Sequence, residues 1–421
     1  MIPNPIRAIY QEKSASRLRP RGWLRHYAGL LSLDAGEGMA LAFERDARAR
    51  LGQTAAVALR HARQRRNPTR PRMRSLRVAP GARLRWQSVP APPLPAPDAA
   101  LVRPIAASTC DLDCAIALGA SQFPLPLHLG HECVAEVLSV GERVQQLTPG
   151  ELVVVPFQVN CGECRACRSG HTGNCTSVPP VSMYGMGLVG GLWGNAFADQ
   201  LAVPYAEAML VALPDGVDPV VAASVSDNIC DAYRHLAPHL PRLLAEDPDA
   251  DVLIVAATKA PFYFSPSLPL YGGLIARALG ARRVRVADAR PHVREHARRL
   301  GLEALHPREL RSVPRAPLVI DNTGGELGLV LSRTAPDGVC TSSGGLHRSA
   351  RVPMLRMYGR NVTLHLGRTH ARALMPEVLA LIAAGKLDPG PVISCVAPLD
   401  EAPRALDEHF RGGGVKTVLT A

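Results

Sequence analysis

Four cysteines crowd into fifteen residues of the sequence. They are Cys161, Cys164, Cys167 and Cys175. Three thiolates at every third position can surround one side of a cation, and the Gly-containing segment that follows returns a fourth thiolate to complete a tetrahedron. Four sulfur ligands leave no coordination position open, so the spacing predicts a structural zinc site.

Two other uses of clustered cysteines compete with zinc. An iron–sulfur cluster is disfavoured because its bacterial pattern has three residues before a Cys-Pro pair, whereas seven residues precede Cys175-Thr176 here. Disulfides are disfavoured because no secretory signal is recognisable, which leads us to expect a reducing, cytoplasmic compartment. No apolar run approaches the roughly 18 residues that span a bilayer, so a membrane protein is not expected.

A looser set of ligand-type residues precedes this cluster. Cys110 lies in Ser-Thr-Cys-Asp-Leu-Asp, and His131 lies in Gly-His-Glu-Cys. Taken alone, each is more commonly a packed core residue than a metal ligand. Their order along the chain carries more information than either residue by itself.

Strands and helices alternate in the second half of the chain. Buried parallel strands are expected at residues 252–256, 283–287 and 318–321. Helices are expected between them at 270–279 and 292–300, each followed by Gly. This alternation predicts an α/β fold with a Rossmann-type doubly wound parallel sheet, which would bind a ligand beside its strand ends.

The order of these motifs resembles that of the zinc-dependent medium-chain dehydrogenase/reductase superfamily, of the alcohol dehydrogenase type. That family has Cys-x-x-Asp, Gly-His-Glu, a turn into a strand, a four-cysteine loop and then a nucleotide-binding half. The same order runs here through residues 110–113, 130–132, 149–156 and 161–175, and the likeness extends over residues 73–421. The motifs are individually modest and jointly specific.

The resemblance implies a catalytic zinc held by Cys110, His131 and a third ligand. That ligand is Asp227, with Cys230 as the fallback, because both follow a Leu-Pro-Asp-Gly turn at 213–216. Three protein ligands leave the fourth zinc position open for water or a substrate oxygen.

Two further acids complete the implied catalytic residues. Asp113 is expected to hold the free ring nitrogen of His131, and Glu132 to lie close behind the metal. Plainer roles stay open for two of the acids, because Asp113 could cap a helix and Asp227 could be an N-cap before residue 228.

The resemblance also implies a nicotinamide cofactor, NAD(H) in preference to NADP(H). Asp288, at the tip of the second strand of this half, is placed to take the ribose hydroxyls and to repel an extra phosphate. Lys416 matches a basic phosphate contact of the family. Asp288 is equally well explained as a solvated strand end.

One motif of the family is missing. The turn at residues 256–269 lacks Gly-x-Gly-x-x-Gly and carries three aromatics and three prolines, so side chains are expected where phosphates normally lie. The glycines at 272–273 come later and are expected to serve close packing. Lys259 is a nearby cation, but Asp111 stands after Cys110 where an Arg would meet the pyrophosphate.

The proton relay differs from the family as well. Leu112 replaces a common Ser or Thr, and Ala115 stands where some members have a His. A general base remains open among Asp111, Ser108, Thr109 and metal-bound water.

The net charge of +12 is concentrated at the beginning of the chain. Residues 1–72 contain 15 Lys or Arg and 5 Asp or Glu, whereas the remainder is nearly balanced. We interpret this basic extension as a stretch upstream of a true start at Met73, or else as a weakly helical tail. A nucleic-acid-binding arm is least favoured, because no aromatics are interleaved for stacking.

Three parts are expected: the extension at 1–72, a GroES-like, mostly β catalytic domain at 73–227 and 356–421, and the Rossmann-type domain at 228–355. The expected function is a zinc-dependent oxidoreductase that transfers a hydride between an alcohol or carbonyl substrate and NAD(H), with one catalytic and one structural zinc. The alternative is a zinc-stabilised member of the fold that has lost nicotinamide binding and acts as an accessory protein. The family implies a homodimer or homotetramer.

Overall fold

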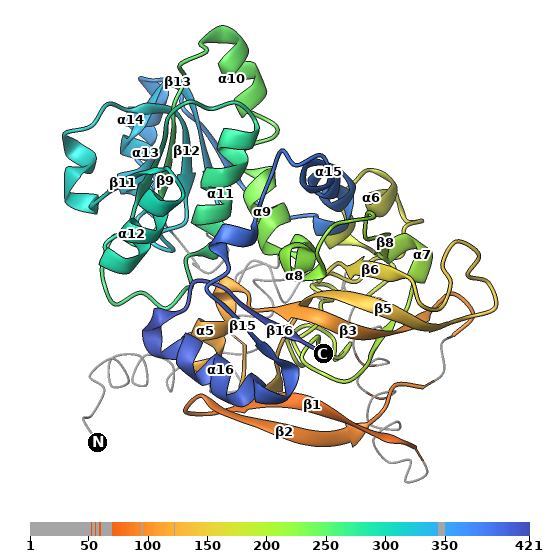
Figure 1. Ribbon diagram of the computed structural model, residues 1–421. Helices are drawn as coiled ribbons and strands as arrows, with labels where there is room; N and C mark the ends of the chain where they lie inside the picture. Colours follow the sequence, from red (N-terminus) through yellow and green to blue (C-terminus); the bar gives the residue numbers. More distant parts are fainter. Residues whose placement is uncertain are drawn as a thin grey trace, which may run out of the picture.

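The computed structural model describes residues 70–93, 96–121, 123–343 and 350–421, together with the single residues 52, 55 and 59. In this part of the chain, two domains lie side by side, each built around its own large sheet (Figure 1). The expectations for the basic extension fall almost wholly outside the described residues. None of the described helices is long and apolar enough to cross a bilayer.

A six-stranded parallel sheet forms the centre of one domain. Its strands are β9 (Val252–Val255), β10 (Val284–Ala287), β11 (Glu303–Leu305), β12 (Ala316–Asp321), β13 (Thr334–Ser342) and β14 (Thr363–Leu366). They are ordered β11-β10-β9-β12-β13-β14. The chain order reverses between β9 and β12, the switch point at which doubly wound folds bind ligands. The predicted Rossmann-type sheet is confirmed.

Helices cover both faces of this sheet, which is why β9 is apolar at every position. Val252 and Ile254 belong to the core shared with α9 and α11, whereas Leu253 and Val255 face the core of α13. The helices of this half are α9 (Asn228–Arg234), α10 (Leu240–Glu246), α11 (Ser267–Ala278), α12 (Pro291–Arg299), α13 (Leu327–Ser332), α14 (Met354–Tyr358) and α15 (Ala371–Ala383).

The glycine pair on α11 serves close packing, as predicted. A Cβ at Gly272 would lie 3.2 Å from Ile254 on β9, and one at Gly273 would lie 2.4 Å from Leu302. The helix therefore approaches the sheet more closely than a helix with larger side chains could.

The structure corrects two predicted boundaries. The Rossmann-type sheet does not end at residue 355, because β14 pairs with β13, and the partly buried Val362 and Leu364 pack against the same core. The helix expected from Leu270 begins at Ser267, because Asp111 accepts hydrogen bonds from the N–H groups of its first turn.

The second domain is mostly β. Its main sheet has the order β15-β16-β3-β5-β6-β8, with β7 pairing with β3, and its strands are β3 (Ala100–Ser108), β5 (Glu132–Val140), β6 (Leu152–Val155), β7 (Leu201–Val203), β8 (Val211–Ala212), β15 (Cys395–Pro398) and β16 (Thr417–Thr420). A three-stranded sheet joins β1 (Arg72–Ala79), β2 (Arg83–Pro90) and β4 (Leu127–His128).

Short helices connect these strands. They are α5 (Asp111–Ala117), α6 (Arg165–Arg168), α7 (Ala206–Met209), α8 (Pro219–Ala222) and α16 (Ala402–Glu408). One-turn segments are η1 (Thr172–Asn174), η2 (Ala223–Ser226), η3 (Pro307–Arg311), η4 (Gly390–Val392), η5 (Leu399–Glu401) and η6 (His409–Gly413).

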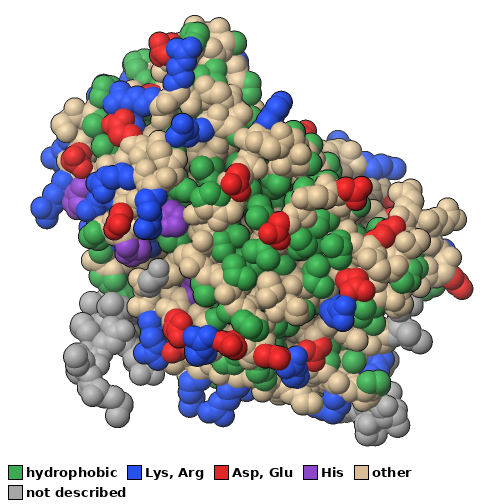
Figure 2. All heavy atoms as spheres, in the orientation of Figure 1, with side chains coloured by type: hydrophobic (Ala, Val, Ile, Leu, Met, Phe, Trp, Pro, Cys, Tyr) green, Lys and Arg blue, Asp and Glu red, His purple; other side chains and the backbone are tan. Residues whose placement is uncertain are grey.

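Charged side chains of both signs alternate along the lower rim of the molecule in Figure 2, where α16 and the β1–β2 hairpin lie. Ion pairs join Arg74 to Asp199 and Asp400, and Arg404 to Glu408. Because opposite charges are interspersed, this rim does not present the single-sign field that attracts nucleic acid.

Candidate active site

Three separate elements bring Cys110, His131 and Asp227 together. Cys110 is the N-cap of α5, Asp227 is the N-cap of α9, and His131 immediately precedes β5. The chain can turn into His131 because Gly130 has a φ of +103°, and a Cβ there would lie 2.6 Å from the ring of Phe197. Glycine is thus required on both conformational and steric grounds.

The ligand atoms have the spacing of a metal site. Asp227 Oδ2 lies 3.3 Å from both Cys110 Sγ and His131 Nε2. Tetrahedral zinc with bonds of about 2.0–2.3 Å separates neighbouring ligand atoms by about 3.3–3.8 Å. A carboxylate oxygen of Glu132 joins the group, in which all ligand atoms lie within 4.8 Å of one another. Cys230, the fallback, is buried on α9 and is not in the group.

The chemistry of this group also fits zinc. All four side chains are buried. Burial, and then the charge of Asp227, raise the pKa of Cys110, while burial raises the pKa of Glu132. Gathering so many anionic groups away from water is costly unless a cation joins them, and a bound cation deprotonates a coordinating thiol.

Asp227 does not act as an N-cap through its side chain. The carboxylate makes no hydrogen bond to the first turn of α9 and instead faces Cys110 and His131. The arrangement therefore favours the ligand role over the capping alternative.

Asp113 serves two neighbours. Its Oδ2 accepts a hydrogen bond from the Cys110 backbone N–H at 2.9 Å, which is the capping role, while its Oδ1 lies 3.9 Å from His131 Nδ1. These last two atoms are buried and have no hydrogen-bond partner within the described part of the chain. A small rotation would join them and hold the ring with Nε2 towards Asp227.

Lys416 contacts Glu132 and not an open phosphate position. Its Nζ is fully buried, 2.7 Å from Glu132 Oε2 and 2.8 Å from Asn228 Oδ1. Although burial opposes it, the carboxylate of Glu132 raises the pKa of Lys416, so the ammonium stays charged. Asn228 was missed by sequence reasoning; its position directly after Asp227 was the available signal.

The four-cysteine loop forms a second compact group. The sulfurs of its members all lie within 4.8 Å of one another, and those of Cys164 and Cys175 are 3.9 Å apart. Four sulfurs around zinc at about 2.3 Å would be separated by about 3.8 Å. Although burial opposes it, hydrogen bonds from the backbone N–H groups of Thr176 and Cys167 lower the pKa of Cys164 to about 5. The loop therefore fits a closed zinc site.

Contacts from outside the loop hold it in place. Arg368 Nη2 donates to the carbonyl of Gly173 and to Asn174 Oδ1, both at 2.9 Å. The N–H of Gly173 in turn donates to His370 Nδ1 at 3.1 Å. The segment between β14 and α15 is thus hydrogen-bonded to the four-cysteine loop.

Asp288 lies at the end of β10, as predicted, but its carboxylate is fully buried. Arg290 donates to its two oxygens at 3.0 and 2.7 Å, and the Ala257 N–H lies 3.4 Å from one of them. Arg290 also donates to the carbonyl of Phe264 at 2.7 Å. Both oxygens of Asp288 are therefore engaged where a ribose hydroxyl would need a free acceptor.

Asp111 takes the position at the N-terminus of α11. Its Oδ2 accepts from the Leu268 N–H at 2.9 Å, and its Oδ1 accepts from the Ser267 N–H at 3.1 Å and from the Ser267 hydroxyl. Burial raises the pKa of Asp111 to about 6, against the opposing charge of Lys416. This helix end is where the fold seats a pyrophosphate, so a dinucleotide could bind here only after the carboxylate of Asp111 had moved away.

The other residues considered for cofactor binding or proton transfer are engaged elsewhere. Ser108 Oγ donates to Glu132 at 2.6 Å, and Thr109 Oγ1 accepts from the Thr417 N–H at 3.1 Å. Lys259 is exposed and pairs with Glu326.

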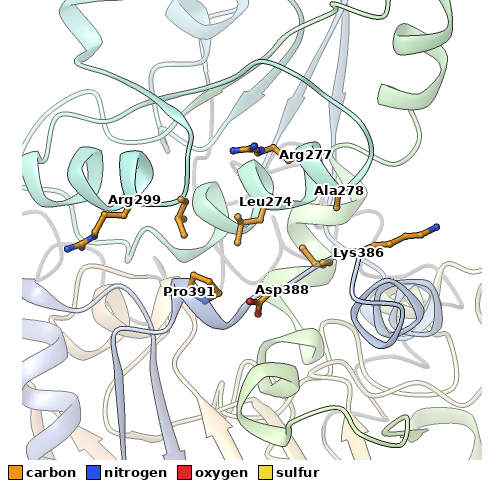
Figure 3. A pocket seen from close by; sticks show the side chains of 9 residues that line it. Leu274, Arg277, Ala278, Arg299, Lys386, Asp388 and Pro391 are labelled. Carbon is orange, nitrogen blue, oxygen red and sulfur yellow. The ribbon is translucent and has the colours of Figure 1, made fainter.

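A surface pocket of about 420 Å³ lies apart from these groups (Figure 3). It is lined by Leu274, Arg277, Ala278, Arg299, Leu300, Lys386, Leu387, Asp388 and Pro391. None of these residues belongs to either cysteine-containing group, so the pocket is not part of the candidate active site.

Comparisons with known proteins point to dehydrogenases. Residues 96–215 match the alcohol dehydrogenase GroES-like domain. The chain is 27% identical to the probable zinc-binding alcohol dehydrogenase Rv1895 of Mycobacterium tuberculosis, over 78% of this chain and 83% of that protein. It is 34% identical to L-galactonate-5-dehydrogenase of Escherichia coli, over 51% of this chain but only 56% of that protein.

A solved structure shares the architecture over most of both chains. The alcohol dehydrogenase TADH from Thermus sp. ATN1 superposes with a TM-score of 0.73 and 29% identity, over 83% of this chain and 99% of that one. A GroES-like domain, a Rossmann-type sheet and a buried Cys-His-Asp group together define a two-domain oxidoreductase of the hydride-transferring class. The chain is therefore similar to zinc-dependent medium-chain dehydrogenases/reductases of the alcohol dehydrogenase type, and these comparisons support the resemblance seen in its motifs.

Proposed function

We propose that this protein oxidises a primary or secondary alcohol, or reduces the corresponding carbonyl compound, with zinc at the reacting oxygen and NAD(H) as the hydride partner. The observation that carries the proposal is the convergence of Cys110, His131 and Asp227, with ligand atoms 3.3 Å apart. A solved relative described as an NAD-dependent alcohol dehydrogenase supports the cofactor class, at 25% identity and a TM-score of 0.65. NADP(H) is the second candidate, because Arg290 offsets the charge of Asp288.

The roles of the residues follow from their positions. Cys110, His131 and Asp227 would hold a zinc ion, which as a Lewis acid polarises a substrate oxygen. Asp113 orients the imidazole, and Glu132 adds a carboxylate whose charge Lys416 balances. These charged groups are buried together, so the charge state of each depends on the neighbouring charges more than on water.

We also propose a structural zinc in the four-cysteine loop and a homodimer in solution. The supports for a dimer are the family and one apolar surface. Leu355 and Tyr358 of α14 are 83% and 84% exposed, and β14 next to them is the last strand of its sheet. An edge strand beside exposed apolar side chains is suited to pairing with a second copy.

The test is metal analysis of the purified full chain together with turnover. We expect two zinc ions per chain and a change in nicotinamide absorbance when alcohols or carbonyl compounds are offered with NAD(H) or NADP(H). Activity should disappear on chelation and return with added zinc. Protein with two zincs that turns over no alcohol, aldehyde or ketone with either cofactor would contradict the proposed activity.

A further inference from the structure

The anion position at the start of α11 is filled by the chain itself. Two backbone N–H groups, those of Ser267 and Leu268, and the Ser267 hydroxyl all donate to the carboxylate of Asp111. The helix has twelve residues, so its N-terminus carries the usual partial positive charge. Asp111 thereby makes the contacts that a phosphate group makes at such a helix end.

The surroundings are built to receive an anion. Asn228 Oδ1 accepts hydrogen bonds from the Lys416 ammonium at 2.8 Å and from the Asp111 N–H at 3.3 Å, and it lies 3.1 Å from the hydroxyl oxygen of Ser267. Asn228 therefore contacts both the buried ammonium of Lys416 and the residue that carries the carboxylate, Asp111. No other lysine, among the residues that the structure describes, contacts this network.

The segment that precedes α11 is tied to the same carboxylate-bearing residue. The Ser265 N–H donates to the carbonyl of Asp111 at 3.1 Å, and the Ser265 hydroxyl lies 2.8 Å from His409 Nε2. Ser265 is thus held by two residues of the mostly β domain, while Arg290 of the other domain donates to the carbonyl of Phe264 in the same segment. A phosphate could not reach the first turn of α11 without breaking the contacts of Asp111.

We propose that Asp111 is an intrachain substitute for the pyrophosphate of a dinucleotide and that it sets the dinucleotide affinity of this protein. The inference rests on the proposed function, because it concerns the cofactor of the same site. Two anions cannot share the same two N–H groups, and their charges repel at this distance. Binding of a dinucleotide therefore requires the carboxylate of Asp111 to leave.

The experiment measures ADP-ribose binding by calorimetry to the full-length, zinc-loaded protein. Asp111→Gly removes the carboxylate and should bind ADP-ribose at least 10-fold more tightly than the wild type. Asp111→Asn keeps the size and some of the hydrogen bonds but removes the charge, so an intermediate gain is expected even if the glycine variant does not fold. Asp215→Asn, an exposed turn residue, should leave the affinity unchanged.

The outcomes separate this inference from the proposed function. Equal affinity of the wild type and both Asp111 variants, whether strong or absent, would overturn the role of Asp111 and leave the dehydrogenase proposal untouched. Tighter binding by the variants, with no turnover of any alcohol or carbonyl compound, would support the role of Asp111 and contradict the activity.

Discussion

Asp227 is the proposed third zinc ligand of the candidate catalytic site, beside Cys110 and His131. Removal of its carboxylate should therefore prevent zinc binding at this site. We expect Asp227→Ala to contain one zinc per chain in place of two, and to lose more activity than the roughly 10–100-fold that removal of an outer-shell partner costs. Asp227→Cys restores a ligand of a type that zinc accepts and should regain the second zinc. Elemental analysis and steady-state rates measure both effects.

The matched control for this substitution is Asp388→Asn, an exposed carboxylate whose Oδ1 accepts a hydrogen bond within its own turn. It should keep both zincs and full activity. If Asp227→Ala also kept two zincs, the third ligand would have to be Glu132, the remaining carboxylate of the group.

The buried side chain of His409 should make the stability of the protein depend on pH. His409 is buried between Ser265 and Thr417, and burial, followed by the charge of Lys416, lowers its pKa to about 4. As pH falls from about 6.5 to about 4, His409 becomes protonated in the unfolded chain but stays neutral in the folded chain. The free energy of unfolding should therefore fall over this window, by about 3 kcal/mol in total.

Urea unfolding of the wild type and of His409→Gln at pH 7 and pH 5 tests this effect. The glutamine can still bond to Ser265 and Thr417 but does not titrate, so its loss of stability between the two pH values should be smaller. Equal losses in the two proteins would show that His409 does not contribute.

At the residue scale, the sequence was informative where chemistry is tied to residue type. The order of the motifs indicated a family resemblance, that resemblance implied that Cys110, His131 and Asp227 meet, and the structure places the three side chains together. It could not predict which side chains neutralise one another, because Arg290 reaches Asp288 across a turn and Lys416 reaches Glu132 from the far end of the chain. Such pairings depend on distances between residues, which spacing alone does not give.

At the scale of elements, the four-cysteine loop should behave as a separate unit. Cys164→Ser removes one ligand of the closed site, so we expect it to retain one zinc and to lose about 2 kcal/mol of stability or more. For a domain of this size that corresponds to a fall of roughly 4–8 °C in Tm. Hydrogen exchange should quicken in residues 161–177 and in the segment around Arg368 and His370 that is bonded to the loop.

Cys395→Ser is the control for this substitution, since Cys395 lies on β15 outside both metal groups. Loss of both zincs from Cys164→Ser would mean that the loop and the active site fold as one unit.

The turn between β9 and α11 shows why some elements resist prediction. Residues 256–269 contain no Gly, and Phe262 and Phe264 of this turn pack against each other with Arg290 over the ring of Phe262. The sequence pattern predicts the start of α11 three residues too late, because the capping carboxylate comes from Asp111 in the other domain. Local capping signals cannot reveal a cap that is so distant in sequence.

At the scale of the whole molecule, the domains are less separate than their sequence segments. The main β sheet takes β16 from the end of the chain, while the parallel sheet takes β14 from a stretch assigned by sequence to the other domain. A boundary near residue 355 was inferred from the alternation of strands and helices, and that alternation gives no sign that one more short strand belongs to the sheet. The end of this domain is set by the pairing of β14 with β13, which the local sequence pattern does not reveal.

The outer side of β14 is where a second copy should bind. We expect the wild-type protein to elute as a dimer in size-exclusion chromatography with light scattering at micromolar concentration. Leu355→Glu places a charge in the exposed apolar surface of α14 and should shift the protein to a monomer, because burying an unpaired carboxylate in an interface is costly. Leu188→Glu, at a 47% exposed leucine in the other domain, should remain a dimer. A monomeric wild type, or a dimer unaffected by Leu355→Glu, would contradict this interface.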